Sequence, residues 1–359
     1  AGFSSDGSIE SLDVRVVANL GAYPHRGWFI PLTALQLAPG PYEIDRVSVE
    51  ALGVVTNTAP TGPYRGAGRP EAGLAIEEVI NAVAAAIGVD PSDVRRRNFV
   101  DPADMPLRTE TGLTHDGGDY AALMVRATDL ARDRAAGQAG RAEHRFIGVG
   151  VASFVETTAG SHFSGEYGRV EVRPDGIAAY TGSTPSGQGH ATVWPVIVAE
   201  RLGVAPEDVA VITGDTGRIP QGTGTFGSRS AAVGGAALVL ATDAVRSAIA
   251  ERAALLLEAS PDDVEVAGGS AYVRGVPSSA ISLAEVAVAA ESAGEPLVAE
   301  ELFIPEDQPL ASGGYAAVVE VDRETGDVRI LDLVAVDDCG VHINSMIVRG
   351  QVHGGMGQG

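Results

Sequence analysis

The sequence predicts an α+β fold in which helices and hairpins form two-layer domains. Apolar and polar residues alternate in segments such as 8–19, as expected of half-buried strands, whereas 71–87 carries apolar residues at helical spacing. The pairs Gly268-Gly269 and Thr325-Gly326 separate short apolar runs in the manner of hairpin turns. No Gly-x-Gly-x-x-Gly opens a helix, and the strict strand–helix–strand rhythm of a Rossmann sheet is missing from the sequence.

The first half of the chain predicts two strands followed by three helices. Gly88 is a typical residue for ending a helix, and Asp90-Pro91 is a typical start for the short helix that follows. In chain order the predicted elements are strands at 8–19 and 46–56, helices at 71–87, 90–97 and 120–137, and a loop at 101–118.

The second half begins with another strand and contains two more helices. Pro195 falls inside a helical pattern that ends at Gly203, and proline is tolerated only in the first turn, so Thr192 is the predicted N-cap. In chain order the predicted elements are a strand at 147–157, a hairpin around Pro174-Asp175-Gly176, a helix at about 192–202, a strand at 209–213, a long helix at about 230–258, and a glycine-dense loop at 350–359.

A chain of 359 residues is long enough for two domains. A shift in composition at 138–146 predicts the boundary, which divides residues 1–140 from 141–359. The chain opens inside a predicted strand and stops at Gly359 in a glycine-dense loop. We therefore expect the first domain to lack its N-terminal part and the second to lack its C-terminal part.

The composition narrows the classes of function. A formal net charge of −22 argues against nucleic acids and anionic membranes as partners, because both attract basic surfaces. The sequence contains no lysine, which excludes a Walker-type phosphate loop and a Schiff-base lysine. Because the overall charge is negative, any phosphate-bearing ligand must be held by local amide and hydroxyl donors rather than by the overall field.

Cys339 is the only cysteine in the sequence. An internal disulfide and a four-cysteine iron–sulfur cluster are therefore impossible within this chain, which fits a reducing, cytoplasmic setting. No apolar run approaches 18 residues, and residues 1–20 lack the features of a signal peptide. We expect a cytoplasmic protein without a membrane span.

The stretch 182–190, Gly-Ser-Thr-Pro-Ser-Gly-Gln-Gly-His, is predicted to turn from a strand into a helix. Gly187 and Gly189 leave the backbone bare on both sides of Gln188, so a flat polar ligand can reach amide donors there. By itself such a pattern is usually a tight turn without a ligand. Three further glycine-dense loops, at 62–70, 221–235 and 350–359, favour a binding role.

Candidate polar groups occur in each of these loops. Ser228 and Ser230 precede the long helix and either cap it or donate to an oxyanion. Arg65 stands in a rigid loop and either forms a surface salt bridge or orients a carbonyl or carboxylate. Gln351 adds an amide side chain beside bare backbone. For His190 a structural role at a helix end is favoured over a general base, and the acids and histidines show no metal-ligand spacing.

Several motifs, in the same order along the chain, resemble the molybdenum hydroxylase family, which includes xanthine dehydrogenase, aldehyde oxidase and the large subunit of aerobic carbon monoxide dehydrogenase. The resemblance covers most of the chain, from Leu20-Gly21-Ala22-Tyr23 onward. The motifs are Pro63-Tyr64-Arg65-Gly66-Ala67-Gly68-Arg69-Pro70, Ser186-Gly187-Gln188-Gly189-His190, Gly214-Asp215-Thr216, Gly224 through Ser230, Asp338-Cys339-Gly340, Ile343-Asn344, and Gly350-Gln351-Val352-His353-Gly354-Gly355.

The resemblance implies a molybdenum cofactor, as molybdopterin or its cytosine dinucleotide, with the metal held through the pterin. Arg65 would orient the substrate and, with Tyr64 and Ala67, border the molybdenum. The residues implied to contact the cofactor are Gly187, Gln188, Gly189, Thr225, Phe226, Gly227, Ser228, Ser230, Ala316 and Gln351.

The family's reaction is oxidative hydroxylation of a small molecule with water as the oxygen source. Electrons leave through iron–sulfur and FAD-containing partner subunits, so the resemblance implies a hetero-oligomer. The family's glutamate base would lie beyond Gly359 and its Gly-Gly-Gly-Phe-Gly motif before Ala1, so the isolated chain is not expected to catalyse. Gly66 stands where carbon monoxide dehydrogenases carry a copper-binding cysteine, which favours an aldehyde or N-heterocycle as substrate.

Two other functions remain open at this point. The chain could be a non-catalytic truncated or split domain that acts only with partner chains. A serine hydrolase is the more distant alternative, with Ser228 or Ser230, His190 and Asp215 as its triad, although no Gly-x-Ser-x-Gly elbow is present.

Overall fold

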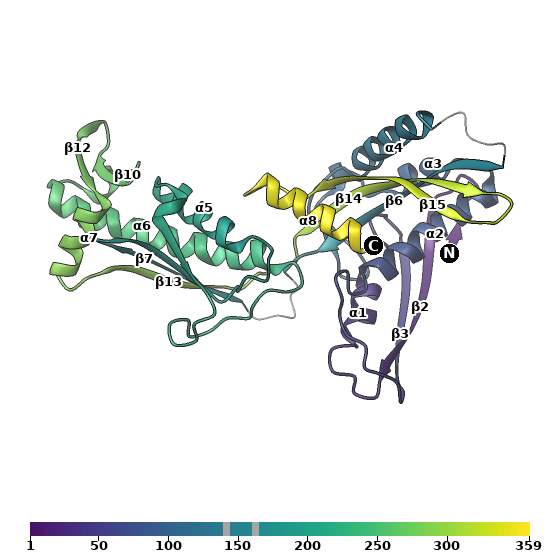
Figure 1. Ribbon diagram of the computed structural model, residues 1–359, viewed down its shortest axis with the longest axis horizontal. Coiled ribbons are helices and arrows are strands. Elements are labelled where there is room, and N and C mark those ends of the chain that lie inside the picture. The colour runs from purple at the N-terminus through teal and green to yellow at the C-terminus, as the bar shows by residue number, and fades with distance from the viewer. Residues whose placement is uncertain (139–143, 160–164) are drawn as a thin grey trace. The chain divides into compact units, whose positions relative to one another are not determined.

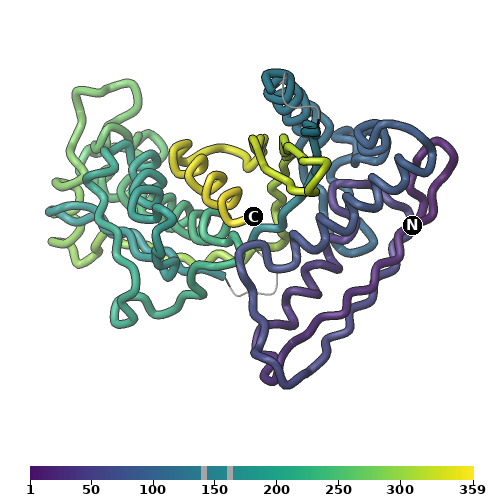
Figure 2. Tube along the Cα trace, turned by 45° about the vertical axis from the view of Figure 1, so that its right-hand side comes forward, coloured from purple at the N-terminus to yellow at the C-terminus, as the bar shows by residue number. Residues whose placement is uncertain are grey.

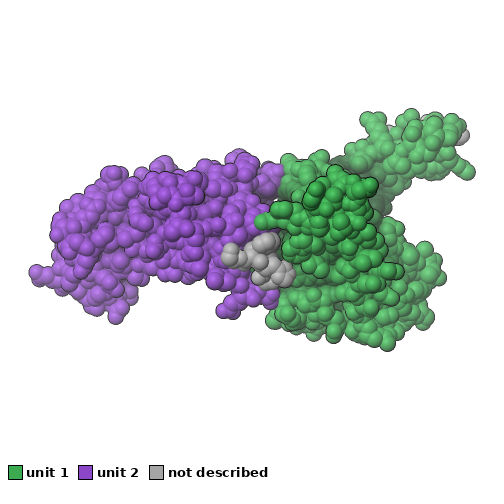
Figure 3. Space-filling view, turned by 90° about the horizontal axis from the view of Figure 1, so that it is seen from below, with its two compact units in different colours: residues 1–157, 309–340, 352–359 green, residues 158–308, 341–351 purple. Residues whose placement is uncertain are grey.

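The computed structural model of the protein describes residues 1–138, 144–159 and 165–359. These residues form two compact units, coloured separately in Figure 3. Unit 1 comprises Ala1–Thr157, Pro309–Gly340 and Val352–Gly359, and unit 2 comprises Thr158–Gln308 and Val341–Gln351.

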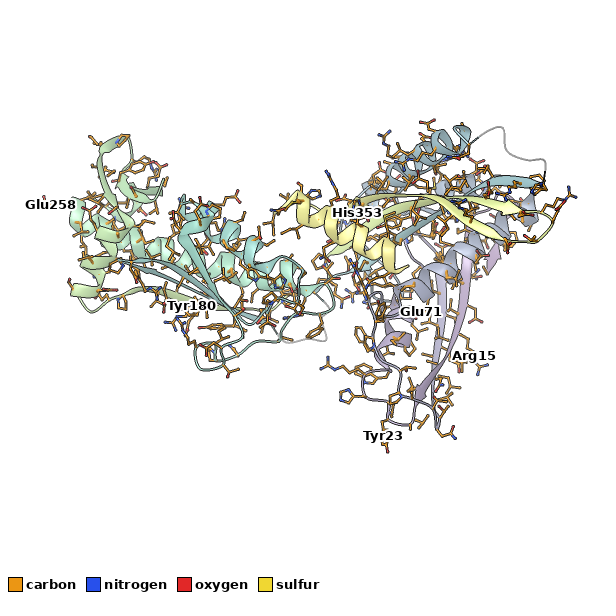
Figure 4. All side chains as sticks on the ribbon, in the orientation of Figure 1. Arg15, Tyr23, Glu71, Tyr180, Glu258 and His353 are labelled. Carbon is orange, nitrogen blue, oxygen red and sulfur yellow. The ribbon has the colours of Figure 1, made fainter. Side chains whose placement is uncertain are left out.

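The first part of unit 1 is a three-stranded sheet with helices against it. The sheet consists of β1 (Gly2–Phe3), β2 (Ile9–Gly21) and β3 (Arg46–Val55), and β2 and β3 run parallel (Figure 2). The side chain of Arg15 on β2 is exposed (Figure 4) and pairs with Glu50 on β3 over 3.1 Å. The helices are α1 (Phe29–Gln36), α2 (Arg69–Ile87) and α3 (Pro91–Asn98). The predicted strands at 8–19 and 46–56 and the predicted helices at 71–87 and 90–97 are confirmed, whereas the sequence analysis does not predict α1.

The ends of α2 and α3 follow local chemistry. Gly88 caps α2 with a left-handed φ of 77°, a conformation that glycine adopts without strain. The Asp90 side chain accepts a hydrogen bond from the Ser92 amide over 2.7 Å and so caps α3. On the inward face of α2, Ile76 and Ile80 are buried in the core of unit 1.

A second layer of unit 1 is built from distant parts of the chain. Helix α4 (Tyr120–Ala136) covers the antiparallel sheet of β6 (Arg145–Thr157), β14 (Leu310–Asp322) and β15 (Val328–Asp338), as Figure 1 shows. A Cβ on Gly314 would lie 2.7 Å from backbone atoms of Leu123 and Met124, so the absence of a side chain lets the helix lie directly on β14. The predicted loop at 101–118 contains a short 3₁₀ helix (Pro102–Asp104), β4 (Leu107–Arg108) and β5 (Thr114–His115).

Unit 2 is an open sheet with helices on one face. Its strands lie in the order β13 (Leu297–Phe303), β7 (Glu166–Arg173), β8 (Gly176–Thr181) and β9 (Val209–Ile212). Helices α5 (His190–Leu202) and α6 (Ala236–Leu257) pack on this sheet, and α7 (Leu283–Ser292) lies against α6 (Figure 1). A small sheet of β10 (Val264–Ala267), β11 (Ser270–Val273) and β12 (Val276–Ser282) completes the unit, together with 3₁₀ turns at Pro206–Asp208 and Pro261–Asp263.

The longest helical stretch, Ser230–Leu257, is apolar and long enough to cross a membrane by length and composition alone. It begins with a π-helical turn, η3 (Ser230–Gly235), and continues as α6. Leu238, Val245 and Ile249 on this stretch are fully buried in the core of unit 2. The stretch therefore packs as the core helix of a globular unit.

Two local predictions are wrong. Helix α5 begins at His190 with Gly189 as its N-cap, not at Thr192, and Pro195 lies inside it. Pro195 and Trp194 are buried in the core of unit 2, and this burial offsets the backbone hydrogen bond that proline cannot make. The glycine-dense end of the chain is not a loop but the helix α8 (Ser345–Gln358).

The two compact units do not follow the predicted division at residue 140. Strand β14 pairs with β6 along its whole length, so a segment after residue 308 returns to the first unit. The predicted boundary segment 138–146 includes residues 139–143, which lie outside the described residues. The division into 1–140 and 141–359 stays a prediction about domains along the sequence.

Candidate functional site

The glycine-rich turn 182–190 joins β8 to α5, as the sequence predicts. Gly187 and Gly189 have φ values of 100° and 87°, which side chains rarely tolerate. The Oε1 atom of the half-buried Gln188 accepts a hydrogen bond from the Ser186 amide. The two N–H groups of the Gln188 carboxamide are thus the part of the side chain suited to donate to a ligand.

The loop at 221–229 lies beside this turn. The hydroxyl of Thr225 donates to the carbonyl oxygen of Thr184 over 2.7 Å, and the hydroxyl of Ser230 donates to Thr225 Oγ1 over 3.4 Å. Ser228 has a left-handed φ of 54°, a strained conformation that is common at functional sites. The hydroxyl cluster predicted from the sequence is therefore attached to the Gln188 turn by a direct hydrogen bond.

A third segment of unit 2, at 341–351, touches the turn 182–190 and shares a groove with η3, which follows the loop at 221–229. A Cβ on Gly189 would lie 2.6 Å from Cδ1 of Ile347, so the turn and the start of α8 touch. Gln351 lies one helical turn after Ile347, on the same face of α8. Ile343 also lines a groove of about 620 Å³ together with Ala231 and Gly235 of η3. The segments that carry Gln188, Ser228 and Gln351 therefore converge within unit 2.

The third predicted loop, at 62–70, belongs to unit 1. Three successive residues, Gly66, Ala67 and Gly68, have positive φ values of 112°, 44° and 101°. A Cβ on Gly68 would lie 2.3 Å from the carbonyl oxygen of Ile30, so this loop is pressed onto α1. Ala67 is one of the few non-glycine residues with such a conformation among the described residues, and this strain marks the loop as a functional candidate.

Arg65 is held by the second half of α8, which belongs to unit 1. Its Nη1 donates to Gln358 Oε1 over 3.3 Å, and Gln358 Nε2 donates to the Tyr64 hydroxyl over 2.9 Å. Side chains at Gly354 or Gly355 would approach the guanidinium to 3.2–3.4 Å, so glycine leaves room for it. The loop thus presents an exposed arginine beside an exposed tyrosine, both oriented by a single glutamine.

The comparisons with known proteins decide the family. A model of a molybdopterin cofactor-binding domain matches residues 123–359, and a second model with the same description matches residues 1–99. The chain belongs to the molybdenum hydroxylase family. The resemblance and the α+β fold class predicted from the sequence are confirmed.

Similar proteins are large subunits of this family. The carbon monoxide dehydrogenase large chain of Hydrogenophaga pseudoflava is 34% identical over 383 residues, which cover 99% of this chain and 47% of that protein. The nicotine 6-hydroxylase large subunit of Paenarthrobacter nicotinovorans is 30% identical and covers 99% of this chain and 47% of that protein. This molybdenum hydroxylase chain therefore spans about half the length of these relatives.

The solved structures show the same fold. Quinoline 2-oxidoreductase from Pseudomonas putida 86 superposes with a TM-score of 0.91 at 34% identity, over 98% of this chain and 48% of that one. The Cu,Mo-CO dehydrogenase has a TM-score of 0.87 at 28% identity, over 98% of this chain and 48% of that one. This chain thus shares its fold with a quinoline 2-oxidoreductase and with a CO dehydrogenase.

The residues of unit 2 fit an anionic cofactor. Gln188 and the backbone near Gly187 are neutral N–H donors, which suit phosphate and pterin oxygens, and Ser230 adds a hydroxyl whose bond to Thr225 is long at 3.4 Å. A Cβ on Gly187 would meet no atom within 4 Å, so a ligand can reach the backbone there. Among the described residues no group of three or more His, Cys, Asp or Glu is placed to hold a metal ion.

His190 has a structural role. It is 5% exposed, its Nδ1 lies 3.1 Å from the carbonyl oxygen of Ser183, and its ring packs 4.6 Å from that of Trp194. Burial lowers its pKa, so it is neutral at pH 7. It makes no hydrogen bond to Ser228, Ser230 or Asp215 in the described part of the chain. The geometry of a serine hydrolase triad is therefore not met.

Two other residues singled out in the sequence lie elsewhere. Ala316 is 4% exposed and packs with Ala127 and Val334 under α4 in the core of unit 1, and its implied contact with the cofactor stays a prediction. Cys339 is exposed rather than buried as a lone cysteine usually is. Partial burial and then the carboxylates of Asp337 and Asp338 raise the pKa of its thiol, which makes it a poor nucleophile.

Sequence reasoning missed a buried ion pair between Glu166 and Arg229 beneath the two loops of unit 2. No local pattern points to it, because the two residues stand 63 positions apart and charged residues are usually exposed. A second groove, of about 710 Å³, is lined by β1, β2 and β3 and contains none of the predicted site residues.

Proposed function

We propose that this chain is the molybdopterin-binding portion of a molybdenum hydroxylase large subunit, an oxidoreductase of the xanthine dehydrogenase and aldehyde oxidase type. The observation that carries the proposal is the convergence, within unit 2, of three separate segments that bear neutral donors: the turn 182–190, the loop 221–230 and the start of α8. An acidic chain needs such a local set of donors to hold an anionic cofactor.

The residues of unit 2 hold the cofactor in this proposal. Gln188, Ser230 and Gln351 donate from side chains, and Thr225 fixes the spacing of two of the loops. Backbone groups and further contacts to the pterin, its phosphate or a dinucleotide tail come from Gly187, Gly189, Phe226, Gly227 and Ser228. When bound, the cofactor supplies two-electron oxidation coupled to oxygen transfer from water.

By the family resemblance, the loop of Tyr64, Arg65 and Ala67 in unit 1 would border the reacting centre and orient the substrate. The planar guanidinium of Arg65 suits a carbonyl or ring nitrogen, and its position is set by Gln358. Gly66 has a φ of 112°, and a Cβ there would lie 2.7 Å from Pro70 Cγ. A metal-binding cysteine at this position would thus strain the loop, which favours an aldehyde, an N-heterocycle or a related small molecule over carbon monoxide.

The electrons leave to iron–sulfur and FAD-bearing subunits in a hetero-oligomer. Support comes from the relatives, which are named large chains or subunits, including a gamma subunit of the 6-hydroxypseudooxynicotine dehydrogenase complex of Paenarthrobacter nicotinovorans at 32% identity. The single cysteine leaves this chain without the thiolates that an iron–sulfur cluster requires. The same cysteine usage favours the cytoplasm as the location.

Elemental analysis of the full-length protein, purified with its neighbouring subunits, tests the proposal. We expect molybdenum near one equivalent per large subunit, and incorporation of ¹⁸O from labelled water into the hydroxylated product of an aldehyde or N-heterocycle. A protein without molybdenum would instead be a module that acts only with partner chains. Labelling by a serine-directed phosphonate would revive the hydrolase alternative.

A further inference from the structure

Glu166 and Arg229 form an ion pair inside unit 2. Glu166 is the first residue of β7 and is fully buried, and the Arg229 side chain is 1% exposed. The Nη1 atom of Arg229 donates to Oε2 of Glu166 over 2.7 Å. Burying two charges is costly unless further hydrogen bonds satisfy them, so the other partners of this pair show what it holds together.

The Glu166 carboxylate accepts hydrogen bonds from both glycine-rich loops of unit 2. Its Oε2 accepts from the Ser183 hydroxyl over 3.1 Å and from the Gly224 amide over 3.2 Å. Oε1 accepts from the Tyr167 amide over 3.1 Å, and a Cβ on Gly182 would lie only 2.5 Å from it. One carboxylate therefore sets the separation between the turn that carries Gln188 and the loop that leads to Ser230.

Arg229 fixes the same loop from its other end. It donates to the carbonyl oxygen of Gly224 over 2.8 Å, and its guanidinium carbon lies 5.8 Å from the centre of the Phe226 ring. Arg229 stands between Ser228 and Ser230, and Ser228 has the strained φ of 54°. Because the arginine side chain is buried and bonded, the backbone on both sides of it has little freedom to relax.

We propose that Glu166 is a positioning residue, which holds the two glycine-rich loops at the spacing required by the cofactor through Ser183, Gly224 and Arg229. The inference rests on the proposed function and adds a residue that the site itself does not include. Since the carboxylate is buried and fully engaged by the protein, it acts through the loops and not by contact with the ligand.

Unit 1 contains a matched control. Glu77 of α2 and Arg95 of α3 form a second buried ion pair, in which Arg95 Nε lies 2.8 Å from Glu77 Oε2. The Glu77 side chain is 8% exposed and the Arg95 side chain is 2% exposed. This pair joins two helices, and the Glu77 carboxylate also accepts a hydrogen bond from the Tyr42 hydroxyl. Among the described residues, the hydrogen-bond partners of the pair lie outside the glycine-rich loops that carry predicted site residues. Glu77→Gln therefore measures the general cost of breaking a buried ion pair.

The experiment uses the full-length protein with its partner subunits, in the parent form and as Glu166→Gln, Arg229→Lys and Glu77→Gln. Molybdenum release is followed by elemental analysis at urea concentrations below the unfolding transition, and the urea midpoint is measured separately. We expect both Glu166→Gln and Glu77→Gln to lower the urea midpoint. Only Glu166→Gln should release molybdenum about tenfold faster than the parent, as happens when groups that orient a ligand are removed. Arg229→Lys keeps the charge without the forked donor and is expected to fall between the parent and Glu166→Gln.

If the parent protein contains molybdenum and Glu166→Gln releases it no faster than the parent does, the inference is wrong and the proposed function still stands. Equal acceleration in Glu77→Gln also overturns the inference, because the effect would then be one of general stability. A parent without molybdenum overturns the proposed function itself. If Glu166→Gln does not fold, Arg229→Lys decides: faster release than in Glu77→Gln supports the positioning role, and release equal to the parent's contradicts it.

Discussion

Gly189 and Ile347 touch so closely that a Cβ on the glycine would lie 2.6 Å from Cδ1 of the isoleucine. Gly189 is the N-cap of α5, and Ile347 lies in the first half of α8. The contact brings a turn near the middle of the chain against a helix near its end. It is the structural reason why the turn that carries Gln188 and the helix that carries Gln351 are neighbours.

Replacing Gly189 by alanine should separate these two elements. Gly187→Ala is the matched control, because Gly187 also has a positive φ but a Cβ there would meet no atom within 4 Å. Both variants carry a left-handed backbone penalty of about 1–2 kcal/mol, whereas Gly189→Ala adds overpacking worth about 1–3 kcal/mol. Urea unfolding measures the difference. Ile347→Ala in the Gly189→Ala background should recover part of the loss, and no recovery would show that the contact is not the cause.

Gln188→Glu should weaken cofactor binding without unfolding the protein. The glutamate keeps the oxygen that accepts from the Ser186 amide but loses two N–H donors and adds a negative charge. Each lost hydrogen bond is worth about 1 kcal/mol, and repulsion from an anionic ligand adds to this. We expect the molybdenum content to fall below about a tenth of the parent's. Gln221→Glu makes the same charge change at an exposed position in the neighbouring loop and should retain the metal.

The local features of the site could be predicted from the sequence. Glycines on both sides of Gln188 and around Ala67 require positive φ values, and the structure places them in such turns. The helix stop at Gly88 and the cap at Asp90 follow from the same local chemistry. These features depend on only a few neighbouring residues.

Features that depend on distant packing could not be predicted. Helix α8 contains Gly350, Gly354, Gly355 and Gly357, so intrinsic propensity argues against a helix there. Its formation reflects tertiary contacts, such as the space that Gly354 and Gly355 leave for Arg65. The pairing of β6 with β14 likewise joins segments that no local pattern connects, which is why the compact units differ from the predicted division.

Arg65→Ala should impair turnover while the cofactor stays bound. Its guanidinium is held beside Tyr64 by Gln358, in unit 1, whereas the proposed pterin donors lie in unit 2. Loss of substrate orientation should lower kcat/KM per molybdenum by about 10–100-fold, which corresponds to about 1.4–2.7 kcal/mol. Steady-state kinetics with aldehydes and N-heterocycles, normalised to metal content, measures this. Arg15→Ala removes an exposed arginine from β2 and should change kcat/KM by less than about twofold.

His115 should make unit 1 sensitive to acid. It is fully buried, its Nδ1 lies 2.7 Å from the Tyr120 hydroxyl, and its Nε2 has no hydrogen-bond partner among the described residues. Burial lowers the pKa of His115 to about 4. The unfolded chain, where the pKa of histidine is about 6.5, therefore binds more protons than the folded chain between these two values.

The contribution of His115 to the stability of unit 1 is therefore fully present above about pH 6.5. This contribution, about 3 kcal/mol, is lost as the pH falls towards 4. Urea unfolding at a series of pH values measures the slope. In His115→Gln the part of the slope due to this group should disappear, because glutamine does not titrate. An unchanged slope in His115→Gln would mean that other groups, such as carboxylates, cause the acid sensitivity.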